Sequence, residues 1–153
     1  MKIKKIILIL TLLIVNTSCG YKPIYLKNDQ LIFEFNKIIL IGNDRLNKKI
    51  VNTVGLIESE FNDNLSELSL ETSFDVEETS KNSKGQVETY RSVINVKLTI
   101  KEDGKVLKSK NFLNEFSYNN KSNKFELSQY QNEIKNNLTN KTSEEILLFL
   151  NLL

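Results

Sequence analysis

Hydrophobic and polar residues alternate along three segments between residues 68 and 118. The clearest is residues 87–100, which ends with apolar side chains at every second position: Ile94, Val96, Leu98 and Ile100. A period of two predicts a strand with one buried face. The same pattern predicts strands at residues 68–76 and 106–118.

Two polar connections separate these three strands. Residues 77–86 predict a loop or hairpin tip, and the Asp103-Gly104 pair is typical of a tight hairpin turn. Four lysines lie in or beside these connections and are candidates for contact with anionic groups such as lipid phosphates: Lys81, Lys84, Lys101 and Lys105. The alternative is that they are ordinary solvent-exposed lysines.

Two other segments repeat their apolar residues every three or four positions, which predicts helices. The first follows Asn43, a suitable N-cap, and continues through Gly55 to a polar end at residues 62–64. Its apolar face is Leu46, Ile50, Val54, Ile57 and Phe61. The second helix covers the C-terminal part of the chain, with a face formed by Leu127, Tyr130, Ile134, Leu138, Thr142 and Ile146. The apolar tail after it, residues 147–153, either packs under the sheet or meets a partner, and we favour packing.

A further strand is predicted at residues 36–41, before the first helix, and a bend would let Phe33 and Phe35 share its apolar face. The order of elements is then β-α-β-β-β-α. Adjacent strands flanked by helices predict an α+β fold. We expect a two-layer sandwich in which two helices pack on one face of a four-stranded, mainly antiparallel sheet. The helix between the first two strands allows them to be parallel.

Composition narrows the chemistry. The 153 residues contain no His and one Cys, so a catalytic triad with His and a zinc site of Cys and His are excluded. The acidic pairs Glu77-Glu78 and Glu144-Glu145 are sequence neighbours, whose side chains do not face each other on a strand or helix. We therefore expect no enzymatic activity, no catalytic residue, no metal and no cofactor.

The N-terminus has the pattern of a secretory signal peptide. Basic residues 2–5 precede an apolar run at residues 6–15, which is too short to cross a bilayer. Small polar residues and Cys19 follow. We expect a signal peptide at residues 1–18, a lipidated segment at residues 19–30 and one α+β domain at residues 31–153. Three of the 21 basic residues lie in the signal peptide, so the rest of the chain is close to neutral and predicts no nucleic-acid partner.

The stretch around Cys19 resembles the lipobox of bacterial lipoproteins. In that class the peptidase cuts between residues such as Ser18 and Cys19, and the cysteine carries covalent lipid. Thr17 and Ser18 match the usual small residues, whereas Asn16 departs from the usual apolar one. A cysteine buried in the protein core is the alternative.

The start of the mature chain resembles the LptE family of lipopolysaccharide-assembly lipoproteins. Residues 19–25 read Cys-Gly-Tyr-Lys-Pro-Ile-Tyr, close to the family's Cys-Gly-aromatic-x-Pro-Leu-Tyr. Weaker matches are Asp44-Arg45-Leu46 and the strand containing Tyr90-Arg91. The resemblance implies an outer-membrane lipoprotein, anchored by lipid on Cys19 and facing the periplasm. It also implies that the chain plugs an LptD-like β-barrel, assists its assembly and delivers lipopolysaccharide to the cell surface. An auxiliary subunit of another transport or secretion system is the alternative.

Overall fold

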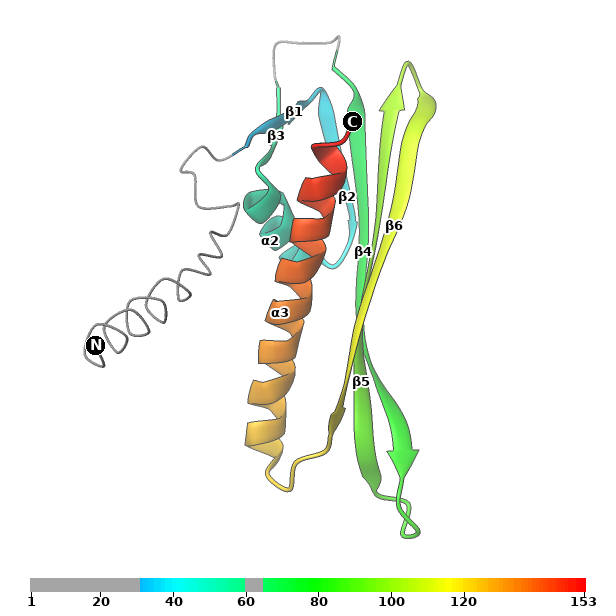
Figure 1. Ribbon diagram of the computed structural model, residues 1–153, viewed down its shortest axis with the longest axis vertical. Coiled ribbons are helices and arrows are strands. Elements are labelled where there is room, and N and C mark those ends of the chain that lie inside the picture. The colour runs from blue at the N-terminus through cyan, green and yellow to red at the C-terminus, as the bar shows by residue number, and fades with distance from the viewer. Residues whose placement is uncertain (1–30, 60–64) are drawn as a thin grey trace, which may run out of the picture. The chain divides into compact units, whose positions relative to one another are not determined.

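A computed structural model describes residues 31–59 and 65–153. Its main element is a four-stranded sheet in the order β2-β4-β5-β6 (Figure 1). The strands are β2 (Lys37–Gly42), β4 (Glu67–Lys81), β5 (Val87–Glu102) and β6 (Lys105–Asn119). β2 is parallel to β4, and the other two pairs are antiparallel.

Two helices cover one face of this sheet: α2 (Asp44–Val54) and α3 (Lys124–Leu150) (Figure 1). The fold class is therefore α+β as predicted, including the parallel pairing of the first two strands of the sheet. Both helices begin at the expected kind of residue, because the side chains of Asn43 and Asn123 accept hydrogen bonds from backbone N–H groups of the first turn.

The core lies between the sheet and the helices. The alternating residues of β5 predicted to face inward are all buried, as are the central members of the apolar face of α3: Ile94, Val96, Leu98, Ile100, Ile134, Leu138, Thr142 and Ile146. Part of the C-terminal tail packs here too, with Leu150 buried and Leu147 and Phe149 half-buried against the core. The expected packing of the tail is therefore confirmed for this part. Leu152 and Leu153 are exposed.

The first helix is shorter than the sequence pattern predicts. α2 ends at Val54 because Gly55 adopts a left-handed conformation (φ 77°) and donates its N–H to the carbonyl of Val51. Ile57, expected on the helix face, lies in β3 (Leu56–Glu58) and is exposed, so both that assignment and the expected end at residues 62–64 are wrong. Phe61 lies outside the described residues.

The first strand is divided in two. β1 (Phe33–Phe35) forms a separate parallel pair with β3, whereas β2 joins the main sheet. The chain changes sheet at Asn36, so Phe33 and Phe35 do not continue the face of β2 as expected. Phe35 is nevertheless buried in the core.

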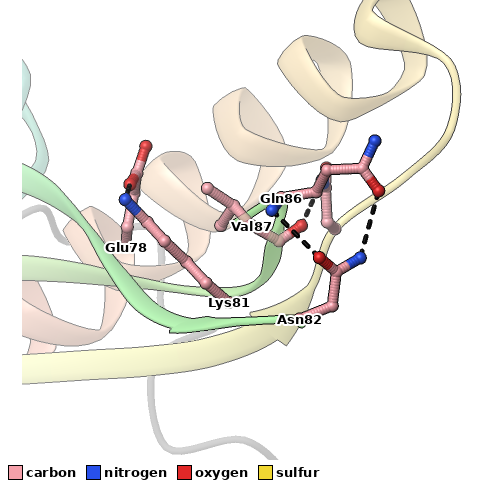
Figure 2. A network of polar contacts seen from close by, with 6 residues as sticks. Glu78, Lys81, Asn82, Gln86 and Val87 are labelled. Atoms are coloured by element: carbon pink, nitrogen blue, oxygen red, sulfur yellow. Dashed lines mark hydrogen bonds and ion pairs between the residues drawn. The ribbon is translucent and has the colours of Figure 1, made fainter. Parts of the chain in front are cut away.

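The segment predicted as a loop or hairpin tip at residues 77–86 is strand in its first half, and residues 82–86 form the tip of the hairpin. β4 continues to Lys81, and the turn itself is closed by Asn82, whose side-chain oxygen accepts hydrogen bonds from the backbone N–H of Lys84 and of Gln86 at 2.9 and 3.0 Å. Figure 2 shows the side chains of Asn82 and Gln86 facing each other across this turn. Residues 77–81 are exposed, so they carry polar side chains without the alternation of a half-buried strand.

Candidate functional site

An extended polar surface lies on the face of the sheet that is turned away from the helices, which we call the outer face. Strand alternation places on it the residues between the buried positions of β4, β5 and β6. In β4 these are Glu67, Ser69, Glu71, Ser73, Asp75 and Glu77; in β5, Arg91, Val93, Asn95, Lys97, Thr99 and Lys101; in β6, Ser109, Asn111, Leu113, Glu115 and Ser117. Only Val93 and Leu113 among them are apolar, so this face offers mainly hydrogen-bonding and charged groups.

Opposite charges face each other across β4 and β5. The register places Glu67 opposite Lys101, Glu71 opposite Lys97, and Glu77 opposite Arg91. Directly opposed side chains on one face of an antiparallel pair are neighbours, and opposite charges there stabilise the pairing. Three of the four acidic residues that β4 places on this face thus have a basic residue opposite, whereas Asp75 lies opposite Val93.

The ordered contacts extend to β6. Arg91 forms an ion pair of 3.7 Å with Glu115, and the hydroxyls of Thr99 and Ser109 are 3.2 Å apart. The Nε of Arg91 is buried and has no hydrogen-bond partner. The outer face is therefore an organised polar surface, and no signal other than strand alternation points to it in the sequence.

The four candidate lysines do not form one cluster. Lys81 and Lys84 lie at the hairpin between β4 and β5, whereas Lys101 and Lys105 lie at the hairpin between β5 and β6. These hairpins are at opposite ends of β5, whose 16 residues span about 50 Å at the usual rise of a strand. Lys81 also pairs with Glu78 at 3.0 Å (Figure 2). A single anion could contact only one of the two pairs.

A shallow hollow of about 560 Å³ lies near the start of α3. It is lined by residues 116–121 and Tyr130, and is open to solvent. Tyr118 stacks on Tyr90 with ring centres 5.8 Å apart and meets Tyr130 edge-on at 5.6 Å. These tyrosine rings mainly pack against each other. The hollow is therefore a surface feature at the edge of the hydrophobic core.

The acidic pairs are separated, as expected of sequence neighbours. Glu77 and Glu78 lie opposite Arg91 and Tyr90 respectively, on different faces of β4. Glu145 accepts a hydrogen bond from the buried side chain of Asn114 at 3.0 Å, and Glu144 is exposed. Within residues 31–59 and 65–153, no group of three acidic residues is arranged to hold a metal ion. The helices described there include none with the length and apolar character needed to span a bilayer.

The expected processing site lies outside the described residues. Ser18 and Cys19, the signal peptide and the segment at residues 19–30 all belong to the part of the chain whose structure is not described. The lipidation of Cys19 thus stays a prediction of the sequence.

Comparison with known proteins identifies the fold. No protein-family model and no curated sequence matches the chain. Among solved structures, it is similar to rare lipoprotein B from Shewanella oneidensis (TM-score 0.57, 15% identity), with 75% of this chain and 93% of that one covered. It is also similar to a minor lipoprotein from Acinetobacter baumannii (TM-score 0.51, 16% identity, coverage 76% and 90%). Lipoprotein B from Nitrosomonas europaea is a third (TM-score 0.53, 8% identity, coverage 82% and 88%). The chain therefore has the α+β fold of these bacterial lipoproteins.

Proposed function

We propose that this chain is a non-enzymatic outer-membrane lipoprotein of the LptE kind, which plugs an LptD-like β-barrel and assists its assembly for lipopolysaccharide transport. Two lines of support meet in this proposal. The sequence from Cys19 to Tyr25 resembles the start of that family, and the domain that follows has a fold found in bacterial lipoproteins. Lipid on Cys19 anchors the protein, and its domain faces the periplasm.

The observation that carries the plug role is the composition of the outer face. The interior of a wide transmembrane barrel is lined by polar side chains. A domain seated there needs a firm surface that supplies hydrogen-bond donors, acceptors and both signs of charge. The outer face has these properties over three long strands, with serine, threonine and asparagine between the opposed charges of β4 and β5.

Lipopolysaccharide is a further partner in this proposal. Its phosphates would meet either Lys81 and Lys84 or Lys101 and Lys105, because the two pairs lie at opposite ends of the sheet.

The test is a crosslinked pulldown of the tagged full chain from membranes, with mass spectrometry of the recovered proteins. We expect a large outer-membrane barrel that an unrelated tagged lipoprotein does not recover. Asn95→Trp introduces bulk at the centre of the outer face, and Asn132→Trp introduces the same bulk at an exposed position of α3. A misfit in a close-packed contact costs about 1–3 kcal/mol, so Asn95→Trp should lower barrel recovery about fivefold or more.

The outcomes separate the alternatives. Unchanged recovery with Asn95→Trp, or equal loss with Asn132→Trp, would remove the outer face as the contact. An inner-membrane transporter or a secretion ring recovered in place of the barrel would overturn the plug role and support an auxiliary subunit. Circular dichroism of both variants checks that the fold is retained, since exposed substitutions normally change stability by under about 0.5 kcal/mol.

A further inference from the structure

Several parts of the domain meet at one end of the sheet. The register joins Lys37, Glu67, Lys101 and Val106 in one row across the four strands. The hairpin between β5 and β6 closes just beyond this row. We call residues 101–110 the basic hairpin; in Figure 1 its turn is at the upper right.

The C-terminal end of α3 points toward the same end. Phe149 packs edge-on against Phe112 with ring centres 5.9 Å apart, and Lys110 lies about 5 Å from both rings. Tyr130, near the start of α3, instead meets Tyr118 at the far end of β6. α3 therefore runs antiparallel to β6, and the exposed Leu152 and Leu153 follow it toward the end where the basic hairpin lies (Figure 1).

The basic hairpin is amphipathic and fully accessible. It contains four lysines against the two acidic residues Glu102 and Asp103. Between the lysines, Val106 and Leu107 are 59% and 55% exposed. Neighbouring lysines and exposed aliphatic side chains are the combination that binds the interface of an anionic bilayer, where the apolar groups enter and the cations meet lipid phosphates.

The opposite hairpin serves as an internal comparison. Its exposed residues 81 and 83–86 are all polar or glycine, and Lys81 is paired with Glu78. Lysines are therefore present at both ends of the sheet. Exposed aliphatic side chains beside the lysines distinguish the basic hairpin from the opposite one.

Chain length brings this end within reach of a membrane. Leu31 is twelve positions after Cys19 in the sequence, and a chain of that length extends at most about 40 Å. The described chain enters the main sheet at Lys37, in the same row as Lys101. A lipid on Cys19 would thus allow the basic hairpin to reach the bilayer surface, whereas the opposite hairpin lies about 50 Å away along β5.

We propose that the basic hairpin docks on the anionic phospholipid surface of the membrane that holds the lipid anchor. Val106 and Leu107 enter the headgroup region, and Lys105 and Lys108 contact lipid phosphates. The inference rests on the lipid anchor of the proposed function and is independent of the barrel. It gives the anchored domain a fixed orientation, with the hairpin of Lys84 away from the membrane.

The absence of tryptophan from the chain permits a clean test. Leu107→Trp places a single fluorophore in the basic hairpin, and Lys84→Trp places one in the opposite hairpin. The full lipidated protein is reconstituted into vesicles of phosphatidylethanolamine and phosphatidylglycerol that carry a lipid with brominated acyl chains. Flotation first confirms that each variant is anchored.

We expect bromine to quench the tryptophan of Leu107→Trp and to leave that of Lys84→Trp unquenched. Adding Lys105→Glu and Lys108→Glu to the Leu107→Trp protein should weaken docking about fivefold for each lysine lost. In vesicles of phosphatidylcholine, docking of the protein that carries Leu107→Trp alone should be weakened to the same extent. Circular dichroism of the charge-reversed protein shows whether its fold is intact.

Every other outcome overturns the proposal in a defined way. Equal quenching at both hairpins, or at neither, excludes an oriented contact. Quenching of Leu107→Trp that is equal in phosphatidylcholine excludes recognition of anionic lipid. Protein that does not float lacks the anchor, which removes both this inference and the proposed anchoring. The vesicles contain no barrel, so a negative result here leaves the barrel experiment unaffected.

Discussion

Thr72 and Asn47 form a buried hydrogen-bonded pair that fixes α2 on the sheet. The hydroxyl of Thr72 donates to the side-chain oxygen of Asn47 at 2.8 Å and accepts from the backbone N–H of Asn43 at 3.2 Å. The amide nitrogen of Asn47 donates to the carbonyl of Ile41 at 3.2 Å. Both side chains are almost fully buried. This network joins β2, β4 and the first turn of α2.

Thr72→Val keeps the shape of the side chain and removes its hydroxyl. The oxygen of Asn47 then loses its donor in a site closed to water, which costs about 1–3 kcal/mol. With a urea m-value of about 2 kcal/mol/M, a loss of about 2 kcal/mol lowers the unfolding midpoint by about 1 M. Urea unfolding followed by far-ultraviolet circular dichroism measures this shift.

Two further variants identify the cause. Thr72→Ser keeps the hydroxyl and loses one methyl group, so it should cost only about 1 kcal/mol. Asn47→Leu combined with Thr72→Val removes both partners. The double variant should lose about 1 kcal/mol less stability than the sum of the losses in the two single variants. The reasoning is refuted if Thr72→Val is no less stable than Thr72→Ser, or if the two single effects simply add.

Two other predictions follow from glycine geometry and from the lipobox. Gly55→Ala should destabilise the protein by about 2 kcal/mol or more, whereas Gly85→Ala should cost about 1 kcal/mol, as measured by urea unfolding. Both glycines have a φ near 77°, but a Cβ at Gly55 would lie 2.3 Å from the carbonyl oxygen of Leu31 and a Cβ at Gly85 would meet nothing; equal losses would contradict this reasoning. Cys19→Ser should abolish incorporation of radiolabelled palmitate in a bacterial host and leave the precursor uncleaved on a gel, and labelling that persists would place the lipid elsewhere.

Local sequence patterns were enough to predict the buried residues of an element that packs one regular face against the core. The alternation from Ile94 to Ile100 and the helical spacing from Ile134 to Ile146 describe residues that are in fact buried. The Asp103-Gly104 turn was also predictable, because its backbone conformation is set by those two residues: Asp103 has a φ of 48° and Gly104 of 74°. The α+β class follows from the order of these elements.

The candidate sites were predictable only in part. The sequence identified the lysines of both hairpins, but it grouped four residues that a strand of 16 residues holds apart. Strand alternation predicted a polar side of the sheet but not its role, because serine, asparagine and charged residues on a strand indicate exposure and not what they face. Which charges oppose each other depends on the register of β4 and β5, which local sequence does not specify.

The tertiary structure alone decided where elements stop. Gly55 fits a helix interior by spacing, yet the close approach of the Leu31 carbonyl and the pairing of β3 with β1 require a left-handed residue there. Residues 77–81 have the composition of a loop and become strand because residues 87–91 of β5, across the hairpin, supply hydrogen-bond partners. Periodicity within the sequence thus determined which side chains are buried in β5 and in the middle of α3. The distant partners that satisfy each backbone group determined the ends of the elements and the arrangement of the polar surface, because pairing between strands is a contact that neither strand specifies by itself.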